Sequence, residues 1–133
     1  MSGKGNKSRV NTAGENYLEA ILILEDRKKA VRSVDLAEQM GVTKPSVSRA
    51  VHILESGGLV SIDRDHFLHL TEAGRGIAEK IYERHVFFTK ALIRLGVDPD
   101  QAETDACELE HVISDKSFSL LKARCQGAEA RFA

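Results

Sequence analysis

The sequence predicts a mainly α-helical protein with a small β-wing, in which an N-terminal winged helix-turn-helix precedes a helical metal-binding and dimerisation domain. Three observations favour this fold. Two short amphipathic segments flank Gly41, an alternating apolar pattern follows over residues 59–70, and a Cys-x-x-Glu-His turn at residues 107–111 comes after a long amphipathic segment.

Composition limits the classes of function. A chain of 133 residues with 42% hydrophobic residues can bury a core, which excludes a disordered tail. The net charge of −1 means that any contact with DNA depends on a local basic patch. Two cysteines, Cys107 and Cys125, give no disulfide framework. No apolar run approaches ~18 residues and no signal-peptide core is present, so a soluble cytoplasmic protein is expected.

The N-terminal residues 1–14 are polar and basic, and predict a flexible arm that either adds phosphate contacts or simply aids solubility. Residues 15–26 are strongly apolar and contain no helix breaker, which predicts a helix. Asn16 and Glu19 lie three residues apart on a polar edge of that helix. The basic residues of the arm are Lys4, Lys7 and Arg9.

The helix-turn-helix is predicted from two capped segments. Residues 33–40 begin with an N-cap Ser33 and end at Gly41, which supplies the positive φ that ends a helix. Residues 44–56 follow, and small polar and basic side chains at their N-terminal end suit a helix that enters the major groove. An ordinary helical hairpin has the same periodicity. The candidate DNA-contacting residues here are Ser33, Thr43, Lys44, Pro45, Ser46, Ser48 and Arg49.

Residues 59–70 predict the wing, because their apolar residues alternate on either side of a polar centre at residues 63–66. Arg64 and His66 at the tip are further DNA-contacting candidates. A hairpin that only closes the core is the alternative, and the two roles are compatible. Together these segments define a predicted DNA-binding domain over residues 15–72.

Residues 72–95 predict a long helix, capped by Thr71, that carries an apolar stripe. A lone histidine within such a stripe is more often a core residue than a metal ligand. Together with apolar residues further along the chain, the stripe exceeds what a few helices can bury in one protomer, which predicts a dimer interface. The stripe consists of Ile77, Ile81, His85, Phe88, Leu92 and Leu95, and the later residues are Val112, Phe118 and Leu121.

The predicted helix over residues 101–113 carries the metal-binding candidates. Cys107, Glu110 and His111 are spaced i, i+3 and i+4, so they share one face, and Glu103 lies one turn before Cys107. A thiolate, a carboxylate and an imidazole suit a divalent transition metal. The alternative is a surface turn in which a small cysteine packs inward. A final segment starts at Asp115 and its pattern is lost from residue 123, so we predict a metal-binding and dimerisation domain over residues 73–125 and a tail over residues 126–133.

These blocks, in this order, resemble the diphtheria toxin repressor family of metal-dependent repressors. The resemblance covers residues 15–121 and is most specific at Asp105-Ala-Cys-Glu-Leu-Glu-His-Val-Ile-Ser-Asp115, supported by Glu15-Asn-Tyr-Leu18 and Arg84-His85. It implies a homodimeric, metal-activated transcriptional repressor of iron or manganese homeostasis genes that binds a palindromic double-stranded DNA operator. It also implies a short form that ends before the SH3-like third domain of longer members.

The resemblance implies the metal ligands residue by residue. Cys107, Glu110 and His111 match ligands of the main regulatory metal, and His85 matches a ligand histidine of the dimerisation helix. Glu19 matches a carboxylate of the manganese-sensing branch. Asn16 departs from the family pattern, which has Met in the iron-sensing branch and Asp in the manganese-sensing branch.

A second family metal site is also altered in this sequence. Thr89 stands where the iron-sensing branch has a carboxylate, and Glu103 stands where it has a histidine. The second site is therefore either rebuilt from Glu103, His85 and their neighbours or absent. We predict that the main metal bridges the DNA-binding and dimerisation halves and so favours the dimers that fit successive major grooves, about 34 Å apart.

The mixed ligand set predicts Fe(II) as corepressor, with Mn(II) next, because Cys107 favours a softer ion while Glu19 and Glu110 favour a harder one. Zn(II), Co(II) and Ni(II) are expected to bind in vitro. The main competing hypothesis is a metal-independent winged-helix regulator in which Cys107 is a buried structural thiol. An enzyme is not expected, since the sequence contains no phosphate loop and no nucleophile–base pair.

Overall fold

The computed structural model describes residues 11–132, with side chains up to Cys125. Most of the predicted basic arm, residues 1–10, therefore lies outside the described residues. The described chain forms two compact units, divided between Lys80 and Ile81 within one long helix. Over this part of the chain no helix combines the length and the apolar character needed to cross a membrane. The elements, in order, are α1 (Thr12–Arg27), α2 (Ser33–Met40), α3 (Lys44–Ser56), β1 (Val60–Ile62), β2 (Leu68–Leu70), α4 (Glu72–Arg94), α5 (Pro99–Leu109) and α6 (Asp115–Phe132).

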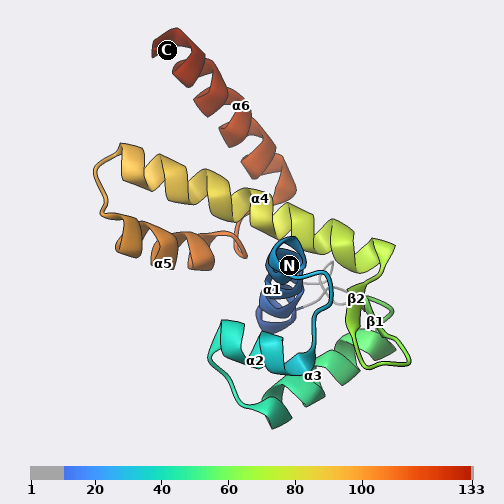
Figure 1. Ribbon diagram of the computed structural model, residues 1–133. Coiled ribbons are helices and arrows are strands. Elements are labelled where there is room, and N and C mark those ends of the chain that lie inside the picture. The colour runs from blue at the N-terminus through green and yellow to red at the C-terminus, as the bar shows by residue number, and fades with distance from the viewer. Residues whose placement is uncertain (1–10, 133) are drawn as a thin grey trace. The chain divides into compact units, whose positions relative to one another are not determined.

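The first unit is a winged helix-turn-helix, which confirms the predicted fold (Figure 1). Helix α1 packs on α2, α3 and β2, while α3 packs on β1. The antiparallel hairpin has the register Val60↔Leu70, and Leu68 also donates its N–H to the carbonyl of Val31 at 2.8 Å, which ties the hairpin to the α1–α2 loop. The largest fully buried apolar side chains are Leu18, Ile21, Val31, Leu36, Val47, Val60 and Leu68.

Helix α1 begins three residues earlier than predicted. The side chain of Asn11 accepts a hydrogen bond from the N–H of Gly14 at 2.8 Å, so Asn11 is the N-cap and the first turn includes the end of the predicted arm. Apolar periodicity places the centre of a helix well, but the start depends on this single cap.

Helix α2 is capped differently from the prediction, because Arg32 and not Ser33 occupies the N-cap position. The carboxylate of Asp35 accepts from the Arg32 N–H at 2.9 Å and from Nζ of Lys28 at 2.8 Å. These hydrogen bonds, first that of Lys28 and then that of Arg32, lower the pKa of Asp35 below its ordinary value. The side chain that caps the start of α2 is therefore that of Asp35, whereas the sequence pattern predicted Ser33.

The turn and the second helix follow the prediction. Gly41 has φ 68°, the left-handed conformation expected at a helix end, and the Thr43 side chain accepts from the N–H of Ser46 at 3.3 Å as the N-cap of α3. Pro45 lies in the first turn, where its missing N–H leaves no helical hydrogen bond unmade.

The wing turn is organised by Asp63. Its Oδ1 accepts from the N–H groups of Asp65 at 2.8 Å and Phe67 at 3.0 Å, and its Oδ2 lies 2.8 Å from Nε2 of His69. The hydrogen bond with His69 is the largest cause of a lowered pKa for Asp63. His66 has φ 68°, so a residue with a side chain adopts the left-handed conformation at the tip.

Helix α4 starts against the wing. Its N-cap is Thr71, whose Oγ1 accepts from the N–H of Gly74 at 3.1 Å and donates to the carbonyl of Gly58 at 2.8 Å. A Cβ at Gly74 would lie 2.0 Å from the carbonyl oxygen of Leu59, so only glycine fits at this contact. The predicted Thr71 cap is confirmed.

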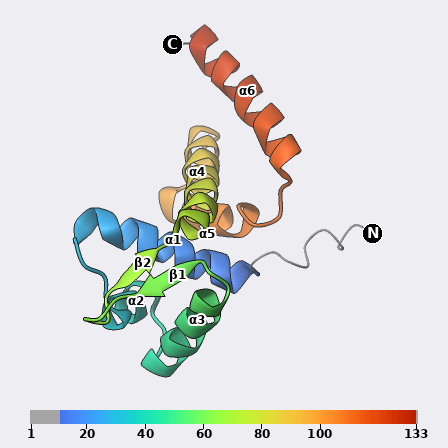
Figure 2. The ribbon, with the colours of Figure 1, turned by 90° about the vertical axis from the view of Figure 1, so that its right-hand side faces the viewer.

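The second unit consists of the later part of α4 with α5 and α6 (Figures 1 and 2). Its core joins the three helices through Phe88, Ala106 and Phe118, and the rings of Phe87 and Phe118 meet edge to face at 5.3 Å between centroids. Helix α5 ends at Leu109, four residues before the predicted end at residue 113. Helix α6 instead continues to Phe132, although an apolar pattern is lost from residue 123, because Ala, Gln, Glu and Arg favour helix without such a stripe.

The predicted dimerisation residues fall into two groups. Phe118 is buried within the protomer at 5% exposure, which contradicts its assignment to an exposed interface. Leu95 lies one residue beyond the end of α4 and is 81% exposed, as an interface residue is before it is covered. A groove of about 440 Å³ lies along α4 and α6, with Tyr82, Phe87 and Cys125 among its lining residues. Among the residues up to Cys125, the exposed large apolar residues of this unit are Tyr82, Ile93, Leu95, Leu109, Val112, Leu120 and Leu121.

Candidate metal centre

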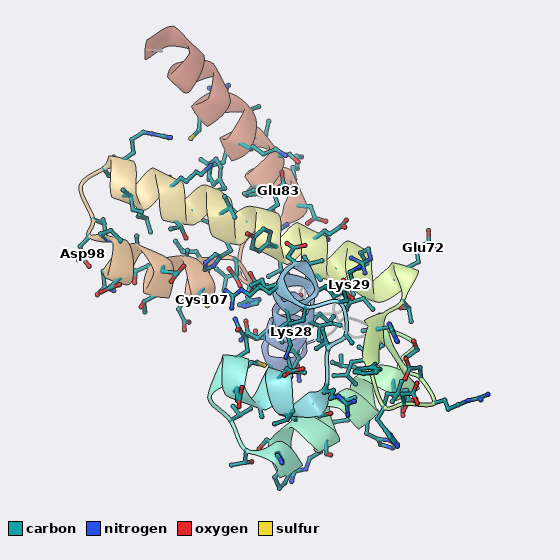
Figure 3. All side chains as sticks on the ribbon, in the orientation of Figure 1. Lys28, Lys29, Glu72, Glu83, Asp98 and Cys107 are labelled. Atoms are coloured by element: carbon teal, nitrogen blue, oxygen red, sulfur yellow. The ribbon has the colours of Figure 1, made fainter. Side chains whose placement is uncertain are left out.

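Three side chains of the second unit form a cluster suited to a metal ion. His85 comes from α4, Cys107 from α5, and Glu110 from the C-cap position of α5. One ligand atom from each lies within 4.8 Å of the other two. Cys107 lies in the last turns of α5 (Figure 3). Imidazole nitrogen, thiolate sulfur and carboxylate oxygen are together a set of donors for a first-row divalent cation.

The carboxylate of Glu110 is the centre of the cluster. Its side chain has no exposed surface, and its Oε1 lies 2.8 Å from Nδ1 of His85. Its Oε2 is buried and makes no hydrogen bond. An unsatisfied carboxylate oxygen in a buried position is costly, and a cation placed beside it would remove that cost. The residues present therefore fit a divalent metal.

His111 lies beside the cluster and not within it. Its Nε2 is 3.3 Å from Oε2 of Glu110 without the geometry of a hydrogen bond, and its side chain is 4% exposed. His111 lies outside the cluster because α5 ends early, at Leu109. The N–H of Glu110 still bonds to the Ala106 carbonyl at 2.9 Å, but that of His111 bonds to Glu108 at 3.4 Å, so the chain tightens and leaves the helical path.

Glu103 lies near Nε2 of His85, the ring nitrogen that does not face Glu110. Its Oε2 lies 3.6 Å from Nε2 of His85, and its side chain is 70% exposed. Thr89, one turn after His85 on α4, has a buried hydroxyl oxygen with no hydrogen-bond partner. The structure therefore places Glu103 and Thr89 near His85 but outside the three-residue cluster.

Arg84, for which no functional role was predicted, contacts the backbone of the segment that carries Glu110 and His111. Its guanidinium donates to the carbonyls of Ile113 at 2.6 Å and Glu110 at 3.4 Å, and pairs with the carboxylate of Asp115. The side chain of Arg84 is 6% exposed. The one signal in the sequence for a role of Arg84 was its position next to His85. Contacts with backbone carbonyls do not depend on residue type, so they produce no recognisable sequence pattern.

The two predicted ligands of the first unit lie on α1. Asn16 is half-buried and Glu19 is buried at 6% exposure. A spacing of three residues on one helix puts their side chains on neighbouring positions of its surface. Both remain predicted ligands.

The predicted DNA-contacting residues of the first unit are accessible. Lys44, Ser48 and Arg49 are exposed on α3, Ser46 is half-buried in its first turn, and Ser33 is half-buried at the start of α2. Basic side chains beside the N-terminus of a helix attract phosphate, because unpaired N–H groups point outward there. Thr43, Pro45, Arg64 and His66 are also exposed, the last two at the tip of the wing.

Two family models match the chain and together cover most of it. Residues 10–67 match the N-terminal DNA-binding domain of iron-dependent repressors, and residues 71–129 match their metal-binding and dimerisation domain.

Named relatives agree with these models. The chain is 31% identical over 108 residues to the transcriptional regulator MntR of Escherichia coli, covering 81% of this chain and 70% of that protein. It is 32% identical over 111 residues to the diphtheria toxin repressor of Corynebacterium diphtheriae, covering 83% of this chain and 49% of that protein. This chain thus spans about half the length of the diphtheria toxin repressor.

Solved structures give the same result. A manganese-dependent transcriptional repressor in complex with manganese matches with a TM-score of 0.74 and 29% identity, covering 84% of this chain and 51% of that one. The manganese regulator SloR matches with a TM-score of 0.69 and 32% identity, covering 77% and 48%. These matches do not favour a metal-independent winged-helix regulator. The chain belongs to the family of iron- and manganese-dependent transcriptional repressors.

Proposed function

We propose that this protein is a transcriptional repressor whose affinity for DNA is raised by a divalent metal held by His85, Cys107 and Glu110. The observation that carries the proposal is the buried Oε2 of Glu110, which has no hydrogen-bond partner although it lies in a cluster of metal-ligating side chains. A bound divalent cation would supply positive charge and fill that position. His111, 3.3 Å from the same oxygen, is the nearest further candidate ligand.

Glu103 fits a supporting role at this centre better than it fits direct ligation. A histidine that binds a metal commonly gives its other ring N–H to a carboxylate, which fixes the orientation of the ring. Glu103, 3.6 Å from Nε2 of His85, is the carboxylate nearest to that N–H and could accept its hydrogen bond, while Nδ1 faces the Glu110 side. The participation of Asn16 and Glu19 in the same centre stays a prediction from the sequence.

The first unit supplies the proposed DNA contacts. Helix α3 presents Lys44, Ser48 and Arg49 to solvent, while its opposite face is held in the core by Val47 and Val51. This division leaves the polar face free to enter a major groove without disturbing the fold. Arg64 and His66 on the wing would add contacts to phosphate or to the minor groove, with sequence read mainly by α3.

A homodimer is the proposed assembly, and it would bind a palindromic operator. The second unit exposes apolar side chains on α4 and α6, among them Tyr82 and Leu121, beside the groove lined by Phe87. Exposed apolar area of this kind is typical of a surface that is covered in the working protein. A two-fold dimer binds two half-sites related by the same symmetry.

Fe(II) is the proposed physiological metal, with Mn(II) as the second candidate. Cys107 is a soft ligand, which favours Fe(II) over Mn(II), whereas the carboxylate of Glu110 accepts either ion. We also propose that the protein acts as a regulator without a catalytic step.

The test is retention of the protein on a DNA fragment that carries its operator, measured with Fe(II) or Mn(II) under anaerobic conditions and again with excess chelator. The proposal expects retention with metal and at least a tenfold weaker affinity with chelator, since about 1.4 kcal/mol of coupling suffices for that change. Equal retention in both conditions would contradict it. Comparing the DNA affinity measured with Fe(II) and with Mn(II) shows which of the two metals activates the protein more strongly.

A further inference from the structure

We propose that Arg84 is a positioning residue for the metal centre, which holds the segment that carries Glu110 and His111 in the geometry needed to bind the ion. The inference rests on the proposed metal site and adds to it a group that touches none of the ligand atoms. Arg84 precedes His85 on α4, so one turn of helix supplies both a candidate ligand and the group that fixes two others.

Arg84 contacts the 110–115 segment at both of its ends. At the first end its Nη1 donates to the carbonyl of Glu110 at 3.4 Å. At the second end it donates to the carbonyl of Ile113 at 2.6 Å, and its Nη2 pairs with the carboxylate of Asp115, the first residue of α6. One guanidinium therefore bridges the end of α5 and the start of α6.

The segment needs this support because its own backbone hydrogen bonds are few. Helix α5 has ended at Leu109, and after Glu110 the next two N–H groups make longer bonds, from His111 to Glu108 at 3.4 Å and from Val112 to Leu109 at 3.2 Å. Carbonyls at a helix C-terminus have no partner within the helix, and Arg84 satisfies one of them at Glu110 itself. Without Arg84, the direction of the Glu110 side chain would be poorly fixed.

The guanidinium is in turn held rigidly. The Arg84 side chain is 6% exposed, and its Cζ lies 5.2 Å from the ring centroid of Phe118, which packs in the core of the second unit. A planar fork of donors can meet two carbonyls and a carboxylate in fixed directions, whereas the ammonium of lysine is a single point of charge. This chemistry distinguishes a positioning role from a general need for a buried cation.

The experiment uses Co(II) as an optical probe of the full-length protein under anaerobic conditions. In the wild type, a thiolate-to-cobalt absorption band that is lost in Cys107→Ser would establish the proposed site. Its absence would contradict that site, and the present inference with it. In Arg84→Lys we expect this band to persist, because Cys107 lies on α5 before the segment. We also expect altered ligand-field bands and an affinity for Co(II) that is lower by about 10- to 100-fold, the range typical of groups that orient metal ligands.

Two matched variants separate positioning from stability. Glu83→Gln removes the ion pair with Lys122 between α4 and α6, and Phe87→Leu weakens the aromatic packing on Phe118. Neither the ion pair nor this ring contact involves a residue of the 110–115 segment. Both are expected to keep the wild-type Co(II) affinity and spectrum. If Phe87→Leu lost as much affinity as Arg84→Lys at equal loss of thermal stability, the positioning role would be wrong.

A wild-type affinity and spectrum in Arg84→Lys would overturn the inference while leaving the metal site itself intact. If Arg84→Lys does not fold, Asp115→Asn decides the question, because its side chain is 72% exposed and its replacement weakens the anchor of Arg84 at the start of α6. A lower affinity with changed ligand-field bands in Asp115→Asn would support the inference. An unchanged affinity would refute it.

Discussion

Nδ1 of His85 lies 2.8 Å from Oε1 of Glu110, a carboxylate whose side chain is wholly buried. We expect Glu110→Gln to lose more than about 100-fold in metal affinity, beyond the loss typical of groups that only orient ligands, because an amide oxygen carries no charge. The fold should survive, since the amide has the same shape and can still bond to the imidazole. Calorimetric titration with Mn(II) measures the affinity, and circular dichroism checks the fold.

Glu108→Gln is the matched control for that prediction, because Glu108 is exposed on α5 and carries the same charge. It should bind Mn(II) as the wild type does. Similar losses in the two variants would mean that total negative charge, and not the buried carboxylate, determines binding.

Cys107 is expected to set the preference between metals. Cys107→Asp replaces a soft thiolate with a hard carboxylate, so the ratio of Co(II) to Mn(II) affinity should fall by about tenfold, or ~1.4 kcal/mol. Competition titrations measure the ratio. Cys125→Ser, which changes the other thiol of the chain, should leave it unaltered, and an unaltered ratio in Cys107→Asp would exclude Cys107 as a ligand.

Arg49 is exposed on α3 and is predicted to contact DNA. Arg49→Ala should weaken operator binding and lower the salt dependence of the binding constant by about one released ion if the contact is to phosphate. Fluorescence anisotropy over a range of salt concentrations gives both quantities. Lys116→Ala removes an exposed cation from α6 and serves as the control. Identical curves for Arg49→Ala and wild type would remove α3 from the proposed interface.

The lowered pKa of Asp35 predicts a pH dependence of stability. The ionised carboxylate is favoured in the folded state, so its contribution is complete well above pH 3.8 and is lost as the pH falls through the lower folded value. Asp35→Asn should therefore unfold at a lower temperature than wild type near neutral pH, and the difference should shrink on acidification. Thermal unfolding at several pH values measures this. A difference that grows on acidification would contradict the assigned direction.

Gly74 and Gly76 offer a paired test within one turn of α4. A Cβ at Gly74 would meet the carbonyl oxygen of Leu59 at 2.0 Å, whereas a Cβ at Gly76 meets nothing within 4 Å. Gly74→Ala should cost about 1–3 kcal/mol, and Gly76→Ala should gain about 0.5–1 kcal/mol from its higher helix propensity. Urea denaturation measures both, and a stable Gly74→Ala would mean that α4 does not begin against the wing as described.

The winged helix-turn-helix could be predicted from the sequence because each of its elements has a local sequence signal. Gly41, the Thr43 cap and the alternating wing residues all depend on neighbours in the chain, and all three appear as predicted. The start of α2 was assigned to the wrong cap because arginine is not a usual N-cap residue, and the Arg32 N–H bonds instead to the Asp35 side chain.

The metal centre was only partly accessible from the sequence. The spacing of Cys107 and Glu110 predicted that they share a helix face. The end of α5 at Leu109, however, could not be predicted, because no glycine or proline directly follows it in the sequence. This helix end moves His111 off the helical path. The contacts of Arg84 are with backbone carbonyls, and any residue type can supply a carbonyl. Such an interaction becomes visible only when α4, α5 and α6 are seen together.

The backbone conformation of His66 at the wing tip lowers the stability of the fold. A residue with a side chain in the left-handed conformation costs about 1–2 kcal/mol relative to glycine, and His66 adopts it at φ 68°. A turn selected for stability alone would have glycine there. The imidazole of His66 therefore places an exposed hydrogen-bonding group in the wing turn at a cost in folding free energy, which is the compromise expected of a residue proposed to contact DNA.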